Sequence, residues 1–125
     1  MNTKYILAHD FGTSGDKASL FTTDGKFVGT RTTGYPSHTL PNGGVEQDPQ
    51  DWWKAFCRST KELTRDIDVR DILCVAFDGT YPNCLCVDAD GNVLNNAYIW
   101  QDVRAVEECA ELEAMIPREL LLCNS

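Results

Sequence analysis

A turn near the beginning of the chain carries the residue types that bind phosphate groups. The segment Asp10–Lys17 reads DFGTSGDK and comes one residue after the apolar run Tyr5–Ala8. Glycines let a backbone approach phosphate closely, amide N–H groups and the hydroxyls of Thr13 and Ser14 can donate to its oxygens, and the Asp10 carboxylate can hold a magnesium ion. The same spacing fits, equally well, a plain hairpin whose hydroxyls bond locally.

Two further polar segments have the composition of a binding site. Asp78–Asn83 follows the most hydrophobic stretch, Ile72–Phe77, at the kind of strand end where open α/β sheets bind ligands. Trp100–Arg104 combines an aromatic face with a carboxylate and a guanidinium two residues apart, which suits sugar hydroxyls. A strand-to-strand turn explains the first segment as well, and a helix cap by Asp102 is compatible with the second.

Three strands are predicted to position the first turn. Tyr5–Ala8 reads as a buried strand, Lys17–Thr22 alternates as a second, and Phe27–Thr33 resumes as a third after a hairpin turn at Asp24-Gly25. The stretch Tyr35–Gln47 is rich in Pro, Gly, Ser and Asn and predicts a loop.

A helix is predicted to follow that loop. Asp48 is a good N-cap, Pro49 suits the first helical position, and the apolar spacing extends to about Arg65. Trp52 and the other tryptophans are interpreted as core residues. The order continues with the Ile72–Phe77 strand, expected to be covered on both faces.

The last part of the chain predicts a hairpin and a second helix. The segments Cys84–Val87 and Val93–Ile99 flank the turn signal Asp88–Asn92, which lacks the length of a calcium loop. The helix would carry an apolar stripe from Val106 and stop near Pro117.

Composition narrows the class of protein. The chain has 125 residues, 42% of them hydrophobic, and 19 acidic against 11 basic side chains give a formal charge of -8. These values indicate one soluble globular domain and disfavour nucleic acid and anionic membranes as partners. The apolar runs are short and the first residues lack a secretory pattern, so a cytoplasmic protein is expected.

The cysteines are expected to be buried reduced thiols. There are six of them, without a signal peptide and among apolar, strand-like neighbours, which argues against a disulfide framework. Cys84 and Cys86 would share one face of a strand, but the other ligands of a zinc site are not in the sequence pattern, so packing is favoured over metal binding.

With these segments in order, the sequence resembles the amino-terminal part of the FGGY carbohydrate kinases. The similarity covers nearly the entire chain, and several matching stretches in the right order are a strong signal. The matching stretches are Asp10–Ser14 with Lys17, Val45–Pro49 running into Trp52-Trp53, Asp88–Leu94, and Ile99–Arg104.

The resemblance implies an α/β fold. Members of this family have two actin-like, ribonuclease-H-like domains, each a mixed sheet with flanking helices, which close over sugar and ATP. Residues 1–125 would be the amino-terminal part of the first domain, without the second, nucleotide-binding domain.

The resemblance also implies roles for individual residues, with ATP and Mg²⁺ as cofactors and a small-molecule sugar as substrate. The phosphate and the ATP–magnesium complex would be bound by Asp10, Gly12, Thr13, Ser14 and Lys17, with Asp10 as the metal ligand. The sugar would be contacted by Thr80, Tyr81, Asp102 and Arg104.

One departure from the family pattern concerns the substrate. Xylulokinases usually carry Met-His where Tyr81-Pro82 stand, and glycerol kinases carry Arg-Glu there. Neither substrate assignment therefore transfers to this chain. A pentulose such as xylulose, or a related polyol or sugar acid, is the expected substrate of the full-length protein. The alternative is a non-catalytic module, derived from a kinase, that binds a sugar or a protein.

The chain is expected to be inactive alone. In the family the catalytic base comes from a later segment and most adenine contacts come from the second domain, so no catalytic base is expected within these residues. The terminal apolar run Leu120–Leu122 suggests a chain that continues. Uncovered sheet surface would make the isolated piece self-associate or depend on a pairing partner.

Overall fold

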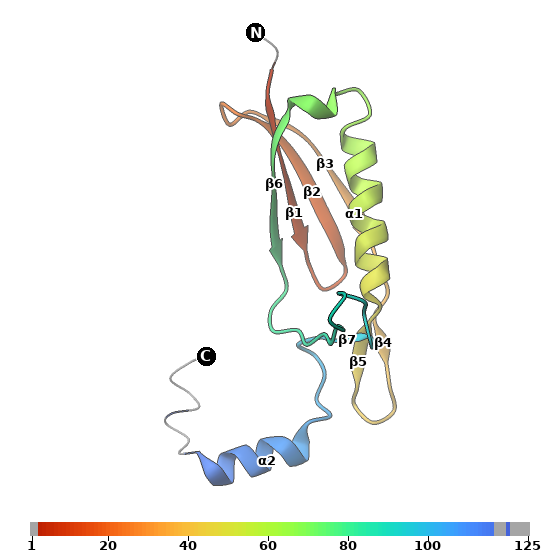
Figure 1. Ribbon diagram of the computed structural model, residues 1–125, viewed down its shortest axis with the longest axis vertical. Coiled ribbons are helices and arrows are strands. Elements are labelled where there is room, and N and C mark those ends of the chain that lie inside the picture. The colour runs from red at the N-terminus through yellow and green to blue at the C-terminus, as the bar shows by residue number, and fades with distance from the viewer. Residues whose placement is uncertain (1–2, 117–119, 121–125) are drawn as a thin grey trace.

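The computed structural model describes residues 3–116 and residue 120 of the chain. Figure 1 shows a sheet with one long helix lying along it, a small second sheet at the end of that helix, and a separate short helix near the C-terminus. The strands are β1 (Tyr5–Phe11), β2 (Gly15–Thr22), β3 (Phe27–Gly34), β4 (His38–Thr39), β5 (Val45–Gln47), β6 (Ile72–Gly79) and β7 (Ala97–Tyr98). The helices are α1 (Pro49–Leu63), the 3₁₀ turn η1 (Val69–Asp71) and α2 (Val106–Met115).

The larger sheet is mixed, as predicted. Within the described residues its strand order is β3-β2-β1-β6, with antiparallel β1–β2 and β2–β3 pairs and a parallel β1–β6 pair. The meander at the start of the chain and the strand that follows α1 are therefore confirmed. The parallel pair brings the carboxyl ends of β1 and β6 to the same edge of the sheet.

Helix α1 covers one face of this sheet. Its start is confirmed: the Asp48 side chain accepts from the backbone N–H of Gln50 at 2.8 Å, and Pro49 occupies the first turn. Ala55 and Ser59 are the buried residues on its sheet-facing side. Because these side chains are small, the helix can lie close to β2 and β3.

The core lies between α1 and the two central strands. Leu7 and Leu20 are 1% exposed and Ala18 is fully buried. The interpretation of the tryptophans as core residues is wrong for two of them, because Trp53 and Trp100 are 61% and 52% exposed.

The region between β3 and α1 differs from the predicted loop. β4 and β5 form a short antiparallel pair inside residues 35–47, and β5 pairs with β7 to make a second sheet of order β4-β5-β7 among the described residues. Such short strands are not predicted from a segment rich in Pro and Gly, because each strand has too few residues to show an alternating pattern.

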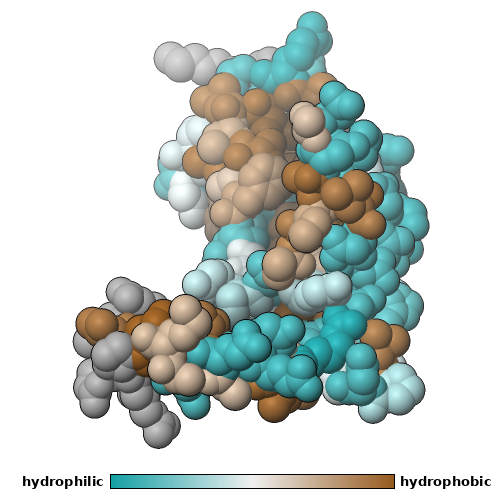
Figure 2. All heavy atoms as spheres, turned by 60° about the horizontal axis from the view of Figure 1, so that its bottom comes forward, coloured by the Kyte–Doolittle hydropathy of each residue, from teal (hydrophilic) through white to brown (hydrophobic). Residues whose placement is uncertain are grey.

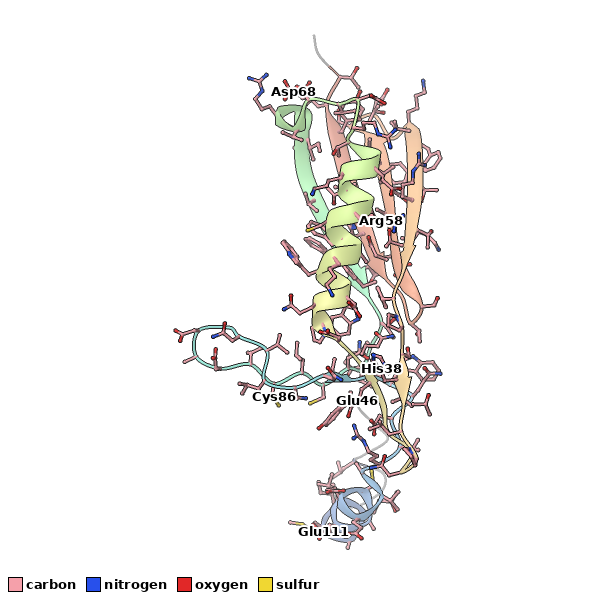
Figure 3. All side chains as sticks on the ribbon, turned by 90° about the vertical axis from the view of Figure 1, so that its right-hand side faces the viewer. His38, Glu46, Arg58, Asp68, Cys86 and Glu111 are labelled. Carbon is pink, nitrogen blue, oxygen red and sulfur yellow. The ribbon has the colours of Figure 1, made fainter. Side chains whose placement is uncertain are left out.

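The predicted hairpin after β6 is mostly irregular. Its two arms meet only in isolated bridges, Cys84 with Tyr98 and Val87 with Val93, within the part of the chain that the structure describes. The turn between them forms as expected, since the Asp88 carboxylate accepts from the N–H groups of Asp90 and Asn92. Figure 3 shows this loop, marked by Cys86, extending away from α1.

Strand β6 is not covered on both faces, contrary to expectation. Leu73 and Phe77 are 62% and 64% exposed, and β6 has no second neighbouring strand among residues 3–116. Helix α2 forms at the predicted place, but none of its described residues is buried. Figure 2 shows hydrophobic atoms gathered at the surface of the upper part of the molecule and again along the lower left.

The thiols are free but less buried than expected. Of the described cysteines, Cys57 is half-buried and the other four, at positions 74, 84, 86 and 109, are exposed. None of the described helices combines the length and the apolar character that a membrane crossing requires. The predicted helix stop at Pro117, and the run Leu120–Leu122 apart from its first residue, lie outside the described residues.

Candidate functional site

The turn between β1 and β2 lies at the edge of the sheet where β1 and β6 end. It is closed by a backbone hydrogen bond from the Gly12 N–H to the Gly15 carbonyl at 3.0 Å. Gly15 packs against β3 so closely that a Cβ there would come within 2.7 Å of the Thr33 carbonyl oxygen. A glycine at this position is therefore required by packing, which the sequence pattern did not reveal.

The carbonyl groups of the turn are bound by donors from other segments. The Phe11 carbonyl accepts from the backbone N–H and the hydroxyl of Thr80, at 2.9 and 3.0 Å. The Gly12 carbonyl accepts from the Tyr35 hydroxyl at 2.5 Å, and the Ser14 carbonyl accepts from the Tyr35 N–H at 3.3 Å. Tyr35 thus holds the turn at two points.

Gln47 and Trp100 hold the tip of the turn. The Gln47 side-chain amide donates to the Thr13 carbonyl at 2.7 Å and to the Ser37 hydroxyl at 2.8 Å, and its oxygen accepts from the Trp52 indole at 2.9 Å. The Trp100 indole N–H donates to the Thr13 hydroxyl at 3.0 Å. That bond occupies the oxygen of the hydroxyl and leaves its hydrogen free to donate elsewhere.

These bonds fix which groups the turn offers to a ligand. The five carbonyls from Phe11 to Gly15 all accept hydrogen bonds, whereas the N–H groups of Thr13 and Ser14 have no acceptor among residues 3–116 and 120. Amide and hydroxyl donors in a tight turn that have no acceptor within the protein can bind an anion. The geometry therefore favours phosphate binding over the plain hairpin that the spacing also allowed.

The Asp10 carboxylate lies beside two other charged residues. The strand register pairs Asp10 with Lys17 on β2 and with Asp78 on β6, and residues paired in this way project from the same face of a sheet. Asp10 and Asp78 are exposed. Carboxylate oxygens are the ligands that Mg²⁺ prefers, so the residues present fit the metal that the sequence suggested. Asp78 was not among the predicted metal ligands.

The surroundings of Tyr35 keep its hydroxyl protonated, and therefore able to donate a hydrogen bond. Burial, with smaller contributions from the negative charges of Asp16 and Asp10, raises the pKa of Tyr35 to about 12. The phenol is therefore protonated at any physiological pH and donates to the Gly12 carbonyl. No sequence signal predicts this role, because Tyr35 begins the predicted loop Tyr35–Gln47.

A cavity of about 210 Å³ lies next to the turn and joins it to the second and third polar segments. Among the predicted sugar-contacting residues, Thr80 lines this cavity, whereas Tyr81 does not and is 88% exposed. The lining is rich in aromatic rings and hydroxyl groups, which suit the two faces of a sugar. The lining residues are Phe11, Gly12, Thr13, Tyr35, Gln47, Trp52, Asp78, Gly79, Thr80, Asn83, Ile99 and Trp100.

Asp102 and Arg104 form an ion-pair network outside the cavity lining. The Arg104 guanidinium lies 2.8 Å from both Asp102 and Glu46 carboxylates, and its Cζ lies 4.3 Å from the Tyr98 ring centroid. The Asp102 carboxylate also accepts from the Val45 N–H at 2.9 Å. Figure 3 marks Glu46 near the end of α1, where this network ties the third polar segment to β5.

The proposed helix cap at Asp102 is wrong. Helix α2 has Ala105 at its N-cap position, with no side-chain cap hydrogen bond. Asp102 instead bonds with Arg104, whose hydrogen bond, followed by backbone N–H donors, lowers the pKa of Asp102 to about 2. Asp102 therefore stays ionised and keeps Arg104 in place.

Comparison with known proteins places the chain in a family. Residues 5–121 match the model of the FGGY family of carbohydrate kinases, N-terminal domain. The chain is 34% identical over 119 residues to a xylulose kinase of Escherichia coli (strain K12), covering 93% of this chain and 24% of the relative. It is 32% identical over 114 residues to a glycerol kinase of Chelativorans sp. (strain BNC1), covering 89% of this chain and 23% of the relative.

Solved structures agree with this result. The gluconate kinase of Lactobacillus acidophilus superposes with a TM-score of 0.84 at 26% identity, covering 91% of this chain and 23% of that one. The chain spans about 24% of the length of the curated xylulose kinases it matches. Its mixed sheet with flanking helices is part of the actin-like ATPase fold of these kinases. The chain belongs to the FGGY family of carbohydrate kinases and matches their N-terminal domain.

Proposed function

We propose that the complete protein is an ATP- and magnesium-dependent kinase that phosphorylates a hydroxyl of a small sugar or polyol. In this proposal residues 1–125 are the first part of its first domain and supply the phosphate turn and part of the sugar pocket. The observation that carries the proposal is the hydrogen bonding of the turn. Its carbonyls accept hydrogen bonds from other groups of the protein, whereas the Thr13 and Ser14 amides have no acceptor among the described residues and can donate to a ligand.

The chemistry of phosphoryl transfer explains why such a turn is useful. The transferred phosphoryl group carries negative charge on its oxygens, and catalysis depends on positioning it and neutralising that charge. Fixed N–H donors contribute without reorganising during the reaction. The Thr13 hydroxyl, held by the Trp100 indole, supports the same role.

Asp10 is proposed to bind the magnesium ion, with Asp78 beside it. The support is that these exposed carboxylates stand in register at the ends of neighbouring parallel strands. Magnesium bound there would supply positive charge for the phosphate oxygens. Lys17, paired with Asp10 on the other side, balances the charge of this row of residues.

The sugar is proposed to lie in the cavity beside the turn. Its closeness to Gly12 and Thr13 would bring an acceptor hydroxyl near the transferred phosphate, and Thr80, Asn83 and Trp100 offer groups for polar and stacking contacts. We propose that Asp102 and Arg104 act by holding the segment Trp100–Arg104, which borders the cavity, in place through the ion pairs that Arg104 makes with Asp102 and with Glu46. A pentulose such as xylulose, a related polyol or a sugar acid remains the proposed substrate class.

The general base and the adenine site are proposed to come from other parts of the complete protein. Residues 1–125 alone are therefore expected to show no turnover, because positioning of both substrates is incomplete. The protein is proposed to work in the cytoplasm. The alternative of a non-catalytic module receives no support from the comparisons, whose named relatives are kinases.

The test is a coupled assay of ADP release by the complete protein with a panel of pentuloses, hexuloses, polyols and sugar acids. Residues 1–125 are assayed in parallel. Turnover by the complete protein alone, dependent on Mg²⁺, is the expected result and identifies the sugar. Failure with the whole panel would contradict the kinase proposal, and turnover by residues 1–125 would contradict the assignment of the base to another part.

A further inference from the structure

A buried histidine–aspartate pair lies directly behind the phosphate turn. The His9 Nδ1 atom is 2.9 and 3.1 Å from the two carboxylate oxygens of Asp16, and neither side chain has any exposed surface. The second ring nitrogen, Nε2, is 3.3 Å from the hydroxyl of Thr60 on α1. The pair thus links β1, β2 and α1.

The surroundings of the pair are aromatic. The His9 ring centroid lies 4.6 Å from that of Phe56, 5.9 Å from that of Phe77 and 6.1 Å from that of Phe11. A carboxylate and an imidazole in such a place are costly unless they bond to each other, and well-packed apolar side chains would stabilise the fold at least as well. Stability alone therefore gives no reason for this pair.

The position of the pair suggests a reason. His9 immediately precedes Asp10, and Asp16 immediately precedes Lys17, so the pair spans the base of the turn. Side chains alternate along a strand, which puts His9 and Asp16 on the α1 side and the neighbouring Asp10 and Lys17 on the opposite side. The bond between His9 and Asp16 fixes the two strands against each other where the turn begins and ends.

We propose that His9 and Asp16 are positioning residues for the phosphate turn. Their bond sets the direction of the Asp10 carboxylate and of the Thr13 and Ser14 amides without touching a ligand. The inference rests on the proposed function in that the turn binds the transferred phosphate. The Thr60 contact connects the pair to α1, whose first turn holds the tip of the same turn through Trp52 and Gln47.

The experiment compares two histidine substitutions in the complete protein. An asparagine amide can take the place of Nδ1, so His9→Asn retains the donor to Asp16, whereas a glutamine amide reaches toward the position of Nε2, so His9→Gln loses it. For each variant the readouts are kcat, the KM for sugar, and the hydrogen-exchange rate of the Gly12 amide. Gly12 reports the closure of the turn through its bond to the Gly15 carbonyl.

We expect His9→Gln to lower kcat by roughly tenfold to a hundredfold, the cost of misplacing a reacting group, with little change in the sugar KM. The Gly12 amide should exchange faster in the same variant. His9→Asn should stay close to the wild type in both readouts. Equal behaviour of the two variants in kcat and in exchange would overturn the proposal.

A double variant separates positioning from stability. His9→Leu/Asp16→Val removes both members of the buried pair together, so that neither is left without the other, and its unfolding midpoint should recover relative to either single change. The proposal expects this variant still to show the lowered kcat and the faster Gly12 exchange. A stable double variant with wild-type kcat and exchange would show that the pair serves packing alone.

The outcomes distinguish this inference from the kinase proposal. If the wild-type protein phosphorylates no sugar, the proposed function fails, and the exchange rate of Gly12 still decides whether the pair shapes the turn. If the double variant does not fold, the contrast between His9→Asn and His9→Gln decides the question.

Discussion

The turn proposed to bind phosphate, residues 10–17, is held in different ways on its inner side and on its rim. On the inner side, β1, β2 and α1 bury Leu7, Leu20 and the His9–Asp16 pair to 1% exposure or less. On the rim, residues 80–104 contain Tyr81 at 88% and Trp100 at 52% exposure. The turn is therefore anchored on one side by a packed core and on the other by a few hydrogen bonds.

The two sides of the turn are suited to different roles. The inner side fixes the backbone that presents charge and N–H donors, a task that needs rigidity. The rim contacts the turn through Thr80 and Trp100 and lines the cavity, so its residues can change to suit the proposed sugar without disturbing the core. Substitutions on the two sides should consequently have different effects on stability and on kinetics.

The largest expected effect comes from Asp10. Asp10→Ala in the complete protein should lower kcat/KM by about a thousandfold, because the carboxylate proposed to hold magnesium is lost. Its unfolding midpoint should change little, since Asp10 is exposed. Steady-state kinetics check this, with Asp90→Ala, in the exposed Asp88–Asn92 turn, as the charge-matched control. Unchanged kinetics for Asp10→Ala would remove Asp10 from the site.

Gly15 tests the rigidity of the inner side. Gly15→Ala places a Cβ 2.7 Å from the Thr33 carbonyl oxygen and should destabilise the protein by about 1–3 kcal/mol, the usual cost of overpacking. Urea unfolding followed by circular dichroism measures the change.

Gly91 is the matched control on the exposed loop. It has a φ of +83°, and a Cβ there meets no atom of the described residues within 4 Å. Gly91→Ala should cost about 1 kcal/mol through backbone strain alone and leave kinase activity unchanged. Equal losses of unfolding free energy in the two glycine variants would contradict the contrast between the inner side and the loop.

Trp100 tests the link between rim and turn. Trp100→Phe keeps an aromatic face in the cavity but removes the N–H that donates to the Thr13 hydroxyl. The loss of one neutral hydrogen bond should weaken kcat/KM about fivefold, with the unfolding midpoint unchanged. Kinetics beside thermal unfolding check both parts, and a large loss of stability would show that Trp100 belongs to the core after all.

The smallest expected effect concerns the pH dependence of the rim. The pKa of Asp102 is lowered to about 2, below its ordinary value near 4, so the ionised form is the one that stabilises the folded state. This stabilisation is complete above about pH 4 and is lost as the pH falls toward 2. Asp102→Asn should remove this acid dependence from unfolding curves and, between pH 6 and 8, lower the stability by an amount that does not vary with pH. An acid dependence that survives the substitution would assign it to another carboxylate.

Much of the framework is predictable from local signals. The alternation in Lys17–Thr22, the cap at Asp48 and the continuous apolar run Ile72–Phe77 each report a preference of a few neighbouring residues, and each is confirmed. β4 and β5 were missed because they have only two and three residues, and because the second partner of β5, β7, lies some fifty positions away. The exposure of Phe77 was missed because an apolar run predicts burial but cannot say what does the covering.

The site shows the same limit. The residue types of Asp10, Thr13 and Ser14 indicated phosphate binding. What favours phosphate binding over a plain hairpin is that Tyr35 and Gln47, from another segment of the chain, donate to the carbonyls of the turn. Local sequence does not show which distant side chain binds a given carbonyl. Asp102 was misread for this reason, since its partner Val45 precedes it by more than fifty residues.

A crystal structure of the complete protein with Mg²⁺, a non-hydrolysable ATP analogue and the sugar identified by the assay would show where the transferred phosphate binds. We predict that the terminal phosphate lies within hydrogen-bonding distance of the Thr13 and Ser14 amides, with the magnesium ion at Asp10. A terminal phosphate bound away from this turn, with those amides facing solvent or another protein group, would contradict it.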